Sequence, residues 1–167
     1  MGFLDETSIR SDPSRRRVLC TPVVTYSEGE GKRSRTIFGF MALNGNDVVM
    51  VSETVKAPDM VSFLELVRRE NHAAPIVVVL DNARIHTAKL VGGRAEELGI
   101  IRTFLPPYSP DLQPIEFGWK DLKGELSGIL EFDSAVQEVK PIALKLFSDR
   151  RLSYTVYWTE KFIHDKG

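Results

Sequence analysis

The sequence predicts an α/β domain in which helices pack on the faces of a mixed β-sheet. One observation is that the first third is rich in strand patterns, including a hairpin over residues 36–53. The other is that helix and strand patterns alternate from residue 58 onward, as they do in β-α-β units. Because the chain has no internal repeat, low-complexity tract or interdomain linker, residues 1–167 are predicted to form a single domain.

The chain starts with a short strand over residues 1–9. In this strand Phe3 and Asp5 share one face, and Leu4 and Glu6 share the other, because side chains alternate along a strand. The composition then becomes polar and basic over residues 10–35, where the segment SEGEGK indicates a loop or hairpin tip.

The next elements are a hairpin, a helix and a buried strand. The hairpin turns at Asn44-Gly45-Asn46, which is a strong turn signal. Pro58 opens a helix, since the apolar residues that follow it recur at helical spacing. Residues 75–82, PIVVVLDN, contain a continuous β-branched run, which is typical of a strand buried on both faces.

The second half of the chain continues the alternation. A helix is predicted from Thr87 to about Leu98, with Gly99 as its natural stop, and a short strand follows over residues 100–105. A proline-rich segment, LPPYSPDLQPIE, then leads into a helix that starts at Pro114. The last predicted helix covers residues 133–147, and the tail SYTVYWTEKFI is compatible with either a strand or a helix.

Composition indicates a soluble globular protein of the cytosol. Apolar residues make up 43% and charged residues 27% of the chain, and no apolar run is long enough to span a bilayer. The single cysteine excludes an internal disulfide, and the N-terminus does not have the pattern of a signal peptide. Because the net charge is -1, a nucleic acid would have to bind at a local basic patch.

Three acidic residues are candidates for a site, and each also has a structural interpretation. Asp81 ends the most hydrophobic strand, where α/β sheets place ligands, although such an Asp also caps the following helix. Asp5 lies in an apolar strand, where it could equally be a solvated edge residue. Glu116 would lie at the third position of a helix whose cap is Gln113, so a capping box or an ion pair with Lys120 are alternatives to a site role.

Acidic residues from three separate elements are what hard divalent cations require. Mg²⁺ prefers oxygen ligands, and two such ions roughly 4 Å apart can activate a nucleophile and stabilise the leaving oxygen of a phosphodiester. Zinc is a poor alternative, because one cysteine and three scattered histidines provide no ligand spacing.

The same acidic residues lie in motifs that resemble a known family. FLDET at 3–7, VVVLDNARIH at 77–86 and LPPYSPDLQPIEFGWKDLK at 105–123 resemble the catalytic blocks of DDE transposases. The most similar group is the bacterial and archaeal insertion-sequence branch of the mariner superfamily. The resemblance covers about residues 1–125, and the 34 residues between Asp81 and Glu116 match the spacing of that superfamily. Gln113 stands where the family usually has Asn.

This resemblance implies a ribonuclease H-like fold with a five-stranded mixed sheet. It also implies that Asp5, Asp81 and Glu116 form a triad that binds two Mg²⁺ or Mn²⁺ ions. The implied activity is cleavage and strand transfer at transposon ends by a transposase catalytic domain. Family members usually carry an N-terminal helix-turn-helix region, and none is recognised in this sequence. Three explanations are open: a split reading frame whose separately encoded half supplies the region, a trimmed chain, or a decayed element.

The expected partner is DNA, both at the transposon ends and at the target, and the expected assembly is a homodimer in the cytoplasm that associates with the nucleoid when bound to DNA. His86 could orient the substrate near Asp81 or form a helix-start hydrogen bond. The candidates for DNA contacts are Arg15, Arg16, Arg17, Lys32, Arg33, Arg35, His86, Lys120 and Lys123.

Three other functions are compatible with the sequence. The fold could carry a structure-specific nuclease of the ribonuclease H-like class. The chain could be an inactive remnant that dimerises with a full-length transposase and represses it. Asp81 could also be an aspartyl nucleophile of a phosphohydrolase, but this function leaves the proline-rich segment without a role.

Overall fold

The computed structural model describes residues 1–11, 33–72, 75–106, 112–129 and 131–163. Its centre is one five-stranded sheet with the order β3-β2-β1-β4-β5. β1, β2 and β3 are antiparallel neighbours, whereas β4 runs parallel to β1 and β5 runs parallel to β4. The predicted mixed five-stranded sheet is therefore confirmed. The strands are β1 (Gly2–Arg10), β2 (Ser34–Ala42), β3 (Val48–Ser52), β4 (Ile76–Leu80) and β5 (Ile100–Phe104).

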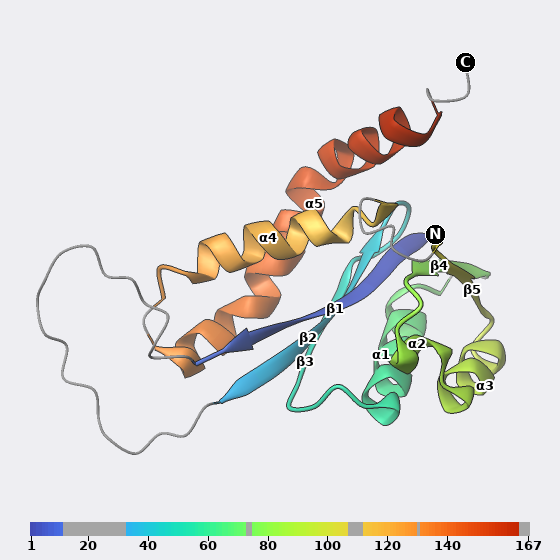
Figure 1. Ribbon diagram of the computed structural model, residues 1–167, viewed down its shortest axis with the longest axis horizontal. Coiled ribbons are helices and arrows are strands. Elements are labelled where there is room, and N and C mark those ends of the chain that lie inside the picture. The colour runs from blue at the N-terminus through green and yellow to red at the C-terminus, as the bar shows by residue number, and fades with distance from the viewer. Residues whose placement is uncertain (12–32, 73–74, 107–111, 130, 164–167) are drawn as a thin grey trace, which may run out of the picture.

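Helices cover both faces of this sheet (Figure 1). Three helices pack on one face, namely α1 (Ala57–Glu70), α2 (Arg84–Thr87) and α3 (Lys89–Glu97). Two helices pack on the other, namely α4 (Ile115–Leu126) and α5 (Phe132–Ile163). The sheet is therefore the middle layer of three, and each face has its own hydrophobic cluster.

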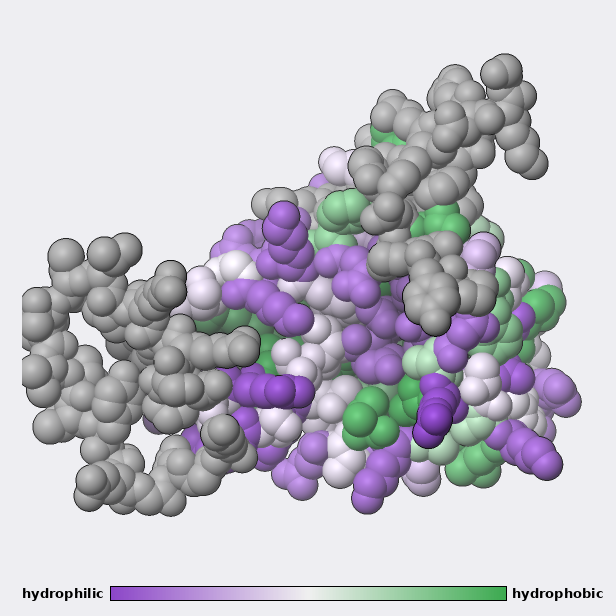
Figure 2. All heavy atoms as spheres, in the orientation of Figure 1, coloured by the Kyte–Doolittle hydropathy of each residue, from purple (hydrophilic) through white to green (hydrophobic). Residues whose placement is uncertain are grey.

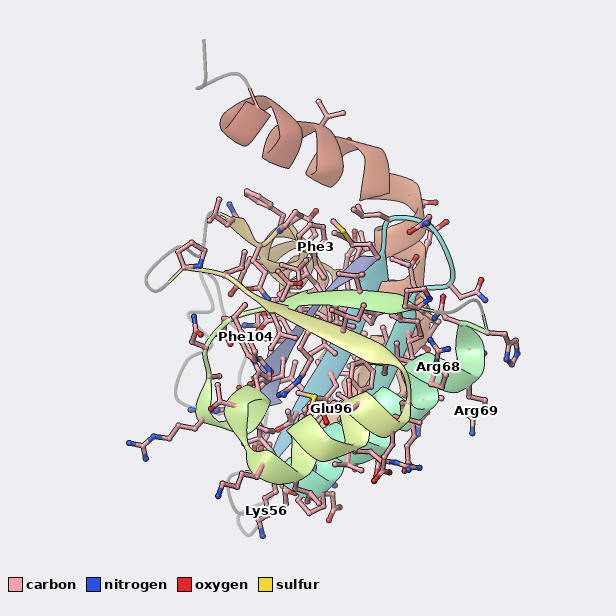
Figure 3. All side chains as sticks on the ribbon, turned by 90° about the vertical axis from the view of Figure 1, so that its right-hand side faces the viewer. Phe3, Lys56, Arg68, Arg69, Glu96 and Phe104 are labelled. Atoms are coloured by element: carbon pink, nitrogen blue, oxygen red, sulfur yellow. The ribbon has the colours of Figure 1, made fainter. Side chains whose placement is uncertain are left out.

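Alternation along β1 supplies both clusters. Leu4 is buried with the residues of α1 and α3, whereas Phe3 is buried against α4 and α5, on the opposite side of the sheet from Lys56 at the start of α1 (Figure 3). On the α4 side the rings of Trp119 and Phe147 pack with centroids 5.4 Å apart. Burying an aromatic side chain of this kind contributes about 1.5–3 kcal/mol, so these contacts fix α4 and α5 against the sheet.

Most predicted elements are confirmed, and two regions differ. The four-residue helix α2 was not predicted, because it is too short to show a helical period. The last helix continues to Ile163, well beyond the predicted end at residue 147, and it contains Pro141. The loop or hairpin tip predicted within residues 10–35 lies mostly outside the described residues. In the described part of the chain, no helix is long and apolar enough to cross a membrane.

Candidate active site

Asp5 and Asp81 belong to the neighbouring central strands β1 and β4, close to the point where the pairing of these strands ends. β1 and β4 run parallel, with Phe3 opposite Val79 as the last ladder pair of these two described strands. Continuing this register for two residues would bring Asp5 level with Asp81, although no ladder pairing joins the strands there. Asp81 follows the carboxyl end of β4, which is the kind of position where α/β sheets bind their ligands.

Asp5 is held in a buried position by α4. Its side chain is only 7% exposed, and Trp119 donates a hydrogen bond from Nε1 to Asp5 Oδ2 at 2.9 Å. Gly39 is paired with Asp5 across β1 and β2, and a Cβ atom at this position would overlap the Trp119 ring. The glycine therefore provides the space that lets the indole reach the carboxylate.

Burial and neighbouring acids make Asp5 hard to ionise. Burial is the largest cause, and the carboxylates of Glu116 and Glu6 add to it, so that the pKa of Asp5 rises from 3.8 to about 7. The hydrogen bond from Trp119 acts in the opposite direction but is outweighed. A cation beside Asp5 would favour its ionised form.

The start of α4 is tied to the backbone of β1. Gln113 is buried, and its Nε2 donates to the carbonyl oxygen of Leu4 at 2.9 Å. With the bond from Trp119 to Asp5, two residues of this segment therefore hold two consecutive residues of β1. Glu116 lies between the two attachment points in sequence, and a spacing of three residues places it near the same side of the helix.

The structure corrects the expected cap of α4. The helix begins at Ile115, with Pro114 as the N-cap and no side-chain cap hydrogen bond, so Glu116 is the second helical residue rather than the third. Gln113 does not cap the helix, because its side chain is used in the bond to β1. The capping-box interpretation of Glu116 was therefore wrong.

Glu116 is exposed to solvent, and its pKa is nevertheless changed by neighbouring charges. Partial burial of its carboxylate raises its pKa, Lys123 lowers it, and the charges of Asp81 and Glu6 raise it further. The Asp81 carboxylate after β4 and the Glu6 carboxylate within β1 are therefore among the charges that act on Glu116.

Asp81 both caps the following turn and faces the site. Its Oδ1 accepts hydrogen bonds from the backbone N–H of Ala83 at 2.9 Å and from His86 Nδ1 at 2.6 Å. Its side chain nevertheless remains half exposed. The N-cap of α2 is Ala83, and no side chain caps the helix, so the interpretation of Asp81 as a helix cap was wrong. Its bond to the Ala83 N–H stabilises the turn before α2 and does not exclude a role in binding.

His86 bridges Asp81 and Glu6. The ring is 1% exposed, and its Nε2 lies 2.8 Å from Glu6 Oε2. Burial alone lowers the pKa of His86, but the hydrogen bonds and charges of Glu6 and Asp81 outweigh this effect and raise it. Each ring nitrogen faces a carboxylate oxygen, and the imidazolium form offers an N–H donor to both.

Glu6 was not among the predicted site residues. The strand alternation placed it on the face opposite Asp5, and this face is where α2 presents His86. The contact of the buried His86 with Glu6 and Asp81 would have identified Glu6 as a site residue. This contact depends on the short helix α2, which the sequence does not reveal.

The side chains of the three predicted site residues fit a hard divalent cation as ligands. Asp5, Asp81 and Glu116 offer only carboxylate oxygens, which Mg²⁺ and Mn²⁺ prefer. Among the residues that the structure describes, no three acidic, cysteine or histidine side chains are arranged to hold one ion together. Mg²⁺ commonly binds through one or two carboxylates and completes its shell with substrate phosphate and water, so the observed arrangement still fits.

The predicted DNA-contact residues are dispersed. Arg33 Nη1 donates to both carboxylate oxygens of Asp133 at 3.0 Å, and Arg35 pairs with Glu53 at 3.1 Å. Arg15, Arg16, Arg17 and Lys32 lie outside the described residues.

Two of these candidates lie next to Glu116. Lys120 and Lys123 are exposed on α4, one and two turns after Glu116. The face of the molecule that includes α4 carries many hydrophilic side chains (Figure 2). A direct DNA contact by His86 remains a prediction, and it would require the ring to leave one of its two carboxylate partners.

Comparison with solved structures identifies the fold. The Mos1 strand transfer complex contains a chain that superposes with a TM-score of 0.58 at 16% identity, covering 95% of this chain and 53% of the other. The Mos1 transposase paired-end complex with the left transposon end gives a TM-score of 0.56 at 15% identity, with 95% and 54% covered. A chain of the simian T-cell lymphotropic virus intasome gives 0.59 at 16% identity, with 83% and 45% covered.

These similarities show that the fold is ribonuclease H-like, as predicted. The chain spans about half the length of the solved chains that it matches. A search of curated protein sequences found no match. The family model described as "DDE superfamily endonuclease" matches residues 1–137. Since this match covers most of the chain, the protein belongs to the DDE superfamily endonucleases.

Proposed function

We propose that this domain cleaves DNA at transposon ends and transfers the freed strands, as the catalytic domain of a transposase in the insertion-sequence branch of the mariner superfamily. The observation that supports the proposal is that Glu116 is linked electrostatically to the other two acids: its charge raises the pKa of Asp5, and the charge of Asp81 raises the pKa of Glu116. Family membership and the similarity to Mos1 transposase complexes support it.

Asp5, Asp81 and Glu116 are proposed to hold two divalent cations, Mg²⁺ or Mn²⁺. When bound, these cations supply Lewis acidity for activating the attacking oxygen and stabilising the leaving oxygen of a phosphodiester. The protein contributes geometry: Trp119 fixes the Asp5 carboxylate, and Gln113 fixes the start of the helix that carries Glu116. Fixed ligands reduce the reorganisation that the reaction requires.

DNA is proposed to lie along the exposed flank of α4. Lys120 and Lys123 follow Glu116 on this helix, so that their ammonium groups can contact phosphates near the reacting bond. Arg15, Arg16, Arg17 and Lys32 are proposed as further phosphate contacts. A homodimer and a cytoplasmic, nucleoid-associated location complete the proposal.

Nicking of supercoiled DNA in the presence of Mn²⁺ tests this function. The wild-type chain should nick, and Asp5→Asn, Asp81→Asn and Glu116→Gln should each abolish nicking without unfolding the domain. If the chain requires the helix-turn-helix half, that half is supplied in trans. Equal nicking by the wild type and the three variants would refute the proposal, and preferential cleavage of RNA–DNA hybrids would favour a ribonuclease H-like nuclease.

A further inference from the structure

The imidazole of His86 spans β1 and β4 beyond the point where their backbone pairing ends. Its Nε2 lies 2.8 Å from Glu6 Oε2 on β1, and its Nδ1 lies 2.6 Å from Asp81 Oδ1 at the end of β4. The ring is 1% exposed, so neither contact is exchanged with water at the surface.

The backbone of His86 is fixed from a third strand. Arg102 on β5 donates from Nη1 to the carbonyl oxygen of His86 at 2.7 Å, and the backbone N–H of His86 donates to Ala83. Gly92 of α3 provides space for the guanidinium, since a Cβ atom there would lie 2.8 Å from Arg102 Nη2. The ring is therefore held at its base as well as at both nitrogens.

The two carboxylate oxygens of Asp81 differ in their hydrogen bonds. Oδ1 accepts from both Ala83 and His86, whereas Oδ2 accepts no hydrogen bond from any residue that the structure describes. Rotation of the carboxylate would break both bonds to Oδ1. The half-exposed side chain therefore presents one particular oxygen toward solvent.

We propose that His86, held in place by Glu6, is a positioning residue that orients the Asp81 carboxylate so that Oδ2 is presented to a divalent cation. The inference rests on the proposed function, because it assigns a role to Asp81 in that site. Hydrogen-bond partners behind a ligand commonly change metal affinity by about 10- to 100-fold. A residue with a purely architectural role would change stability without this selective effect.

Two substitutions of His86 separate positioning from architecture. The amide nitrogen of Asn lies close to the position of Nδ1, and the longer Gln places its nitrogen close to the position of Nε2. His86→Asn therefore keeps a donor for Asp81 and loses the bond to Glu6. His86→Gln keeps a donor for Glu6 and loses the bond to Asp81.

The test is the affinity of the full chain for Mn²⁺ alone, measured from the electron paramagnetic resonance signal of free Mn²⁺. His86→Gln should weaken binding by about 10- to 100-fold, whereas His86→Asn, which loses only the support from Glu6, should weaken it clearly less. Thermal unfolding is measured for both variants. Equal affinities for the two variants, or a loss that follows only their stability, would overturn the inference.

A second pair of variants keeps the histidine and tests its support. Glu6→Gln and Glu6→Leu remove the same charge, but only Gln can still bond to Nε2. Glu6→Leu should bind Mn²⁺ more weakly than Glu6→Gln, and equal binding would contradict the proposed support. If the His86 variants do not fold, the comparison of Glu6→Gln with Glu6→Leu tests the inference in their place.

Asp81→Asn distinguishes failure of the inference from failure of the proposed function. If the wild type binds Mn²⁺ and Asp81→Asn does not, Asp81 is a metal ligand. The His86 and Glu6 variants then show whether His86 positions it. If Asp81→Asn binds as tightly as the wild type, Asp81 is not a ligand and both proposals are overturned.

Discussion

Replacing Asp5 by Asn should stabilise the metal-free protein at neutral pH, by an amount that depends on pH. Burial, together with the carboxylates of Glu116 and Glu6, raises the pKa of Asp5 from 3.8 to about 7. The folded state therefore binds the proton more tightly than the unfolded state does. Below about pH 4 Asp5 is protonated in both states, so it does not lower the free energy of unfolding. As the pH rises toward 7, the unfolded state loses this proton first and the free energy of unfolding falls.

The magnitude follows from the difference between the two pKa values. A pKa difference of one corresponds to about 1.4 kcal/mol, so ionised Asp5 should lower the free energy of unfolding by about 4 kcal/mol above pH 7. Asn is neutral at every pH and its amide oxygen can still accept the hydrogen bond from Trp119. The variant should therefore escape the penalty without losing the contact.

Urea unfolding at several pH values between 5 and 8, with a chelator present, measures this effect. The stability difference between Asp5→Asn and the wild type should grow by about 3 kcal/mol over this range, which shifts the urea midpoint by about 1.5 M for an m-value near 2 kcal/mol/M. Glu125→Gln removes an exposed acid from α4 and serves as the control. A difference that does not change with pH would refute the view that Asp5 is a buried acid with a raised pKa.

Three further outcomes are expected. Glu116→Gln should change the melting temperature little, since altering exposed groups at a helix start costs about 1 kcal/mol, yet it should abolish Mn²⁺-dependent nicking; unchanged nicking would remove Glu116 from the site. Gly39→Ala should push the Trp119 ring away from Asp5, cost about 1–3 kcal/mol and change the tryptophan fluorescence, whereas Gly93→Ala, where a Cβ meets nothing within 4 Å, should not. DNA binding by this chain should be weak, without sequence preference and steeply salt-dependent, as phosphate contacts require, so a nanomolar sequence-selective shift at physiological salt would contradict it.

The sequence was sufficient to predict the sheet because its strand signals are local. The β-branched run before Asp81 and the Asn44-Gly45-Asn46 turn each specify an element within a few residues. Gly99 adopts φ 65°, the left-handed conformation expected after a helix. Such signals depend on neighbouring residues alone, and the structure confirms the elements that they predict.

The features that the sequence could not show depend on contacts between distant residues. Gln113 resembles a poor helix cap when only its neighbours are considered, but its partner is the carbonyl of Leu4, 109 residues away. The pairing of Glu6 with His86 spans 80 residues and requires the short helix α2, which has no detectable period. Single-sequence patterns contain no information about which distant residues meet.

The two halves of the candidate site are fixed from opposite faces of the sheet, and β1 connects them. Asp5 points toward α4, where Trp119 holds it, while the next residue, Glu6, points toward α2 and holds His86 against Asp81. Adjacent residues of a strand face opposite sides, so no single helix could provide both contacts. A register shift of one residue in β1 would exchange the two acids between the faces and separate both from their partners. The nine-residue pairing of β1 with β2 opposes such a shift and so maintains the arrangement of the acids.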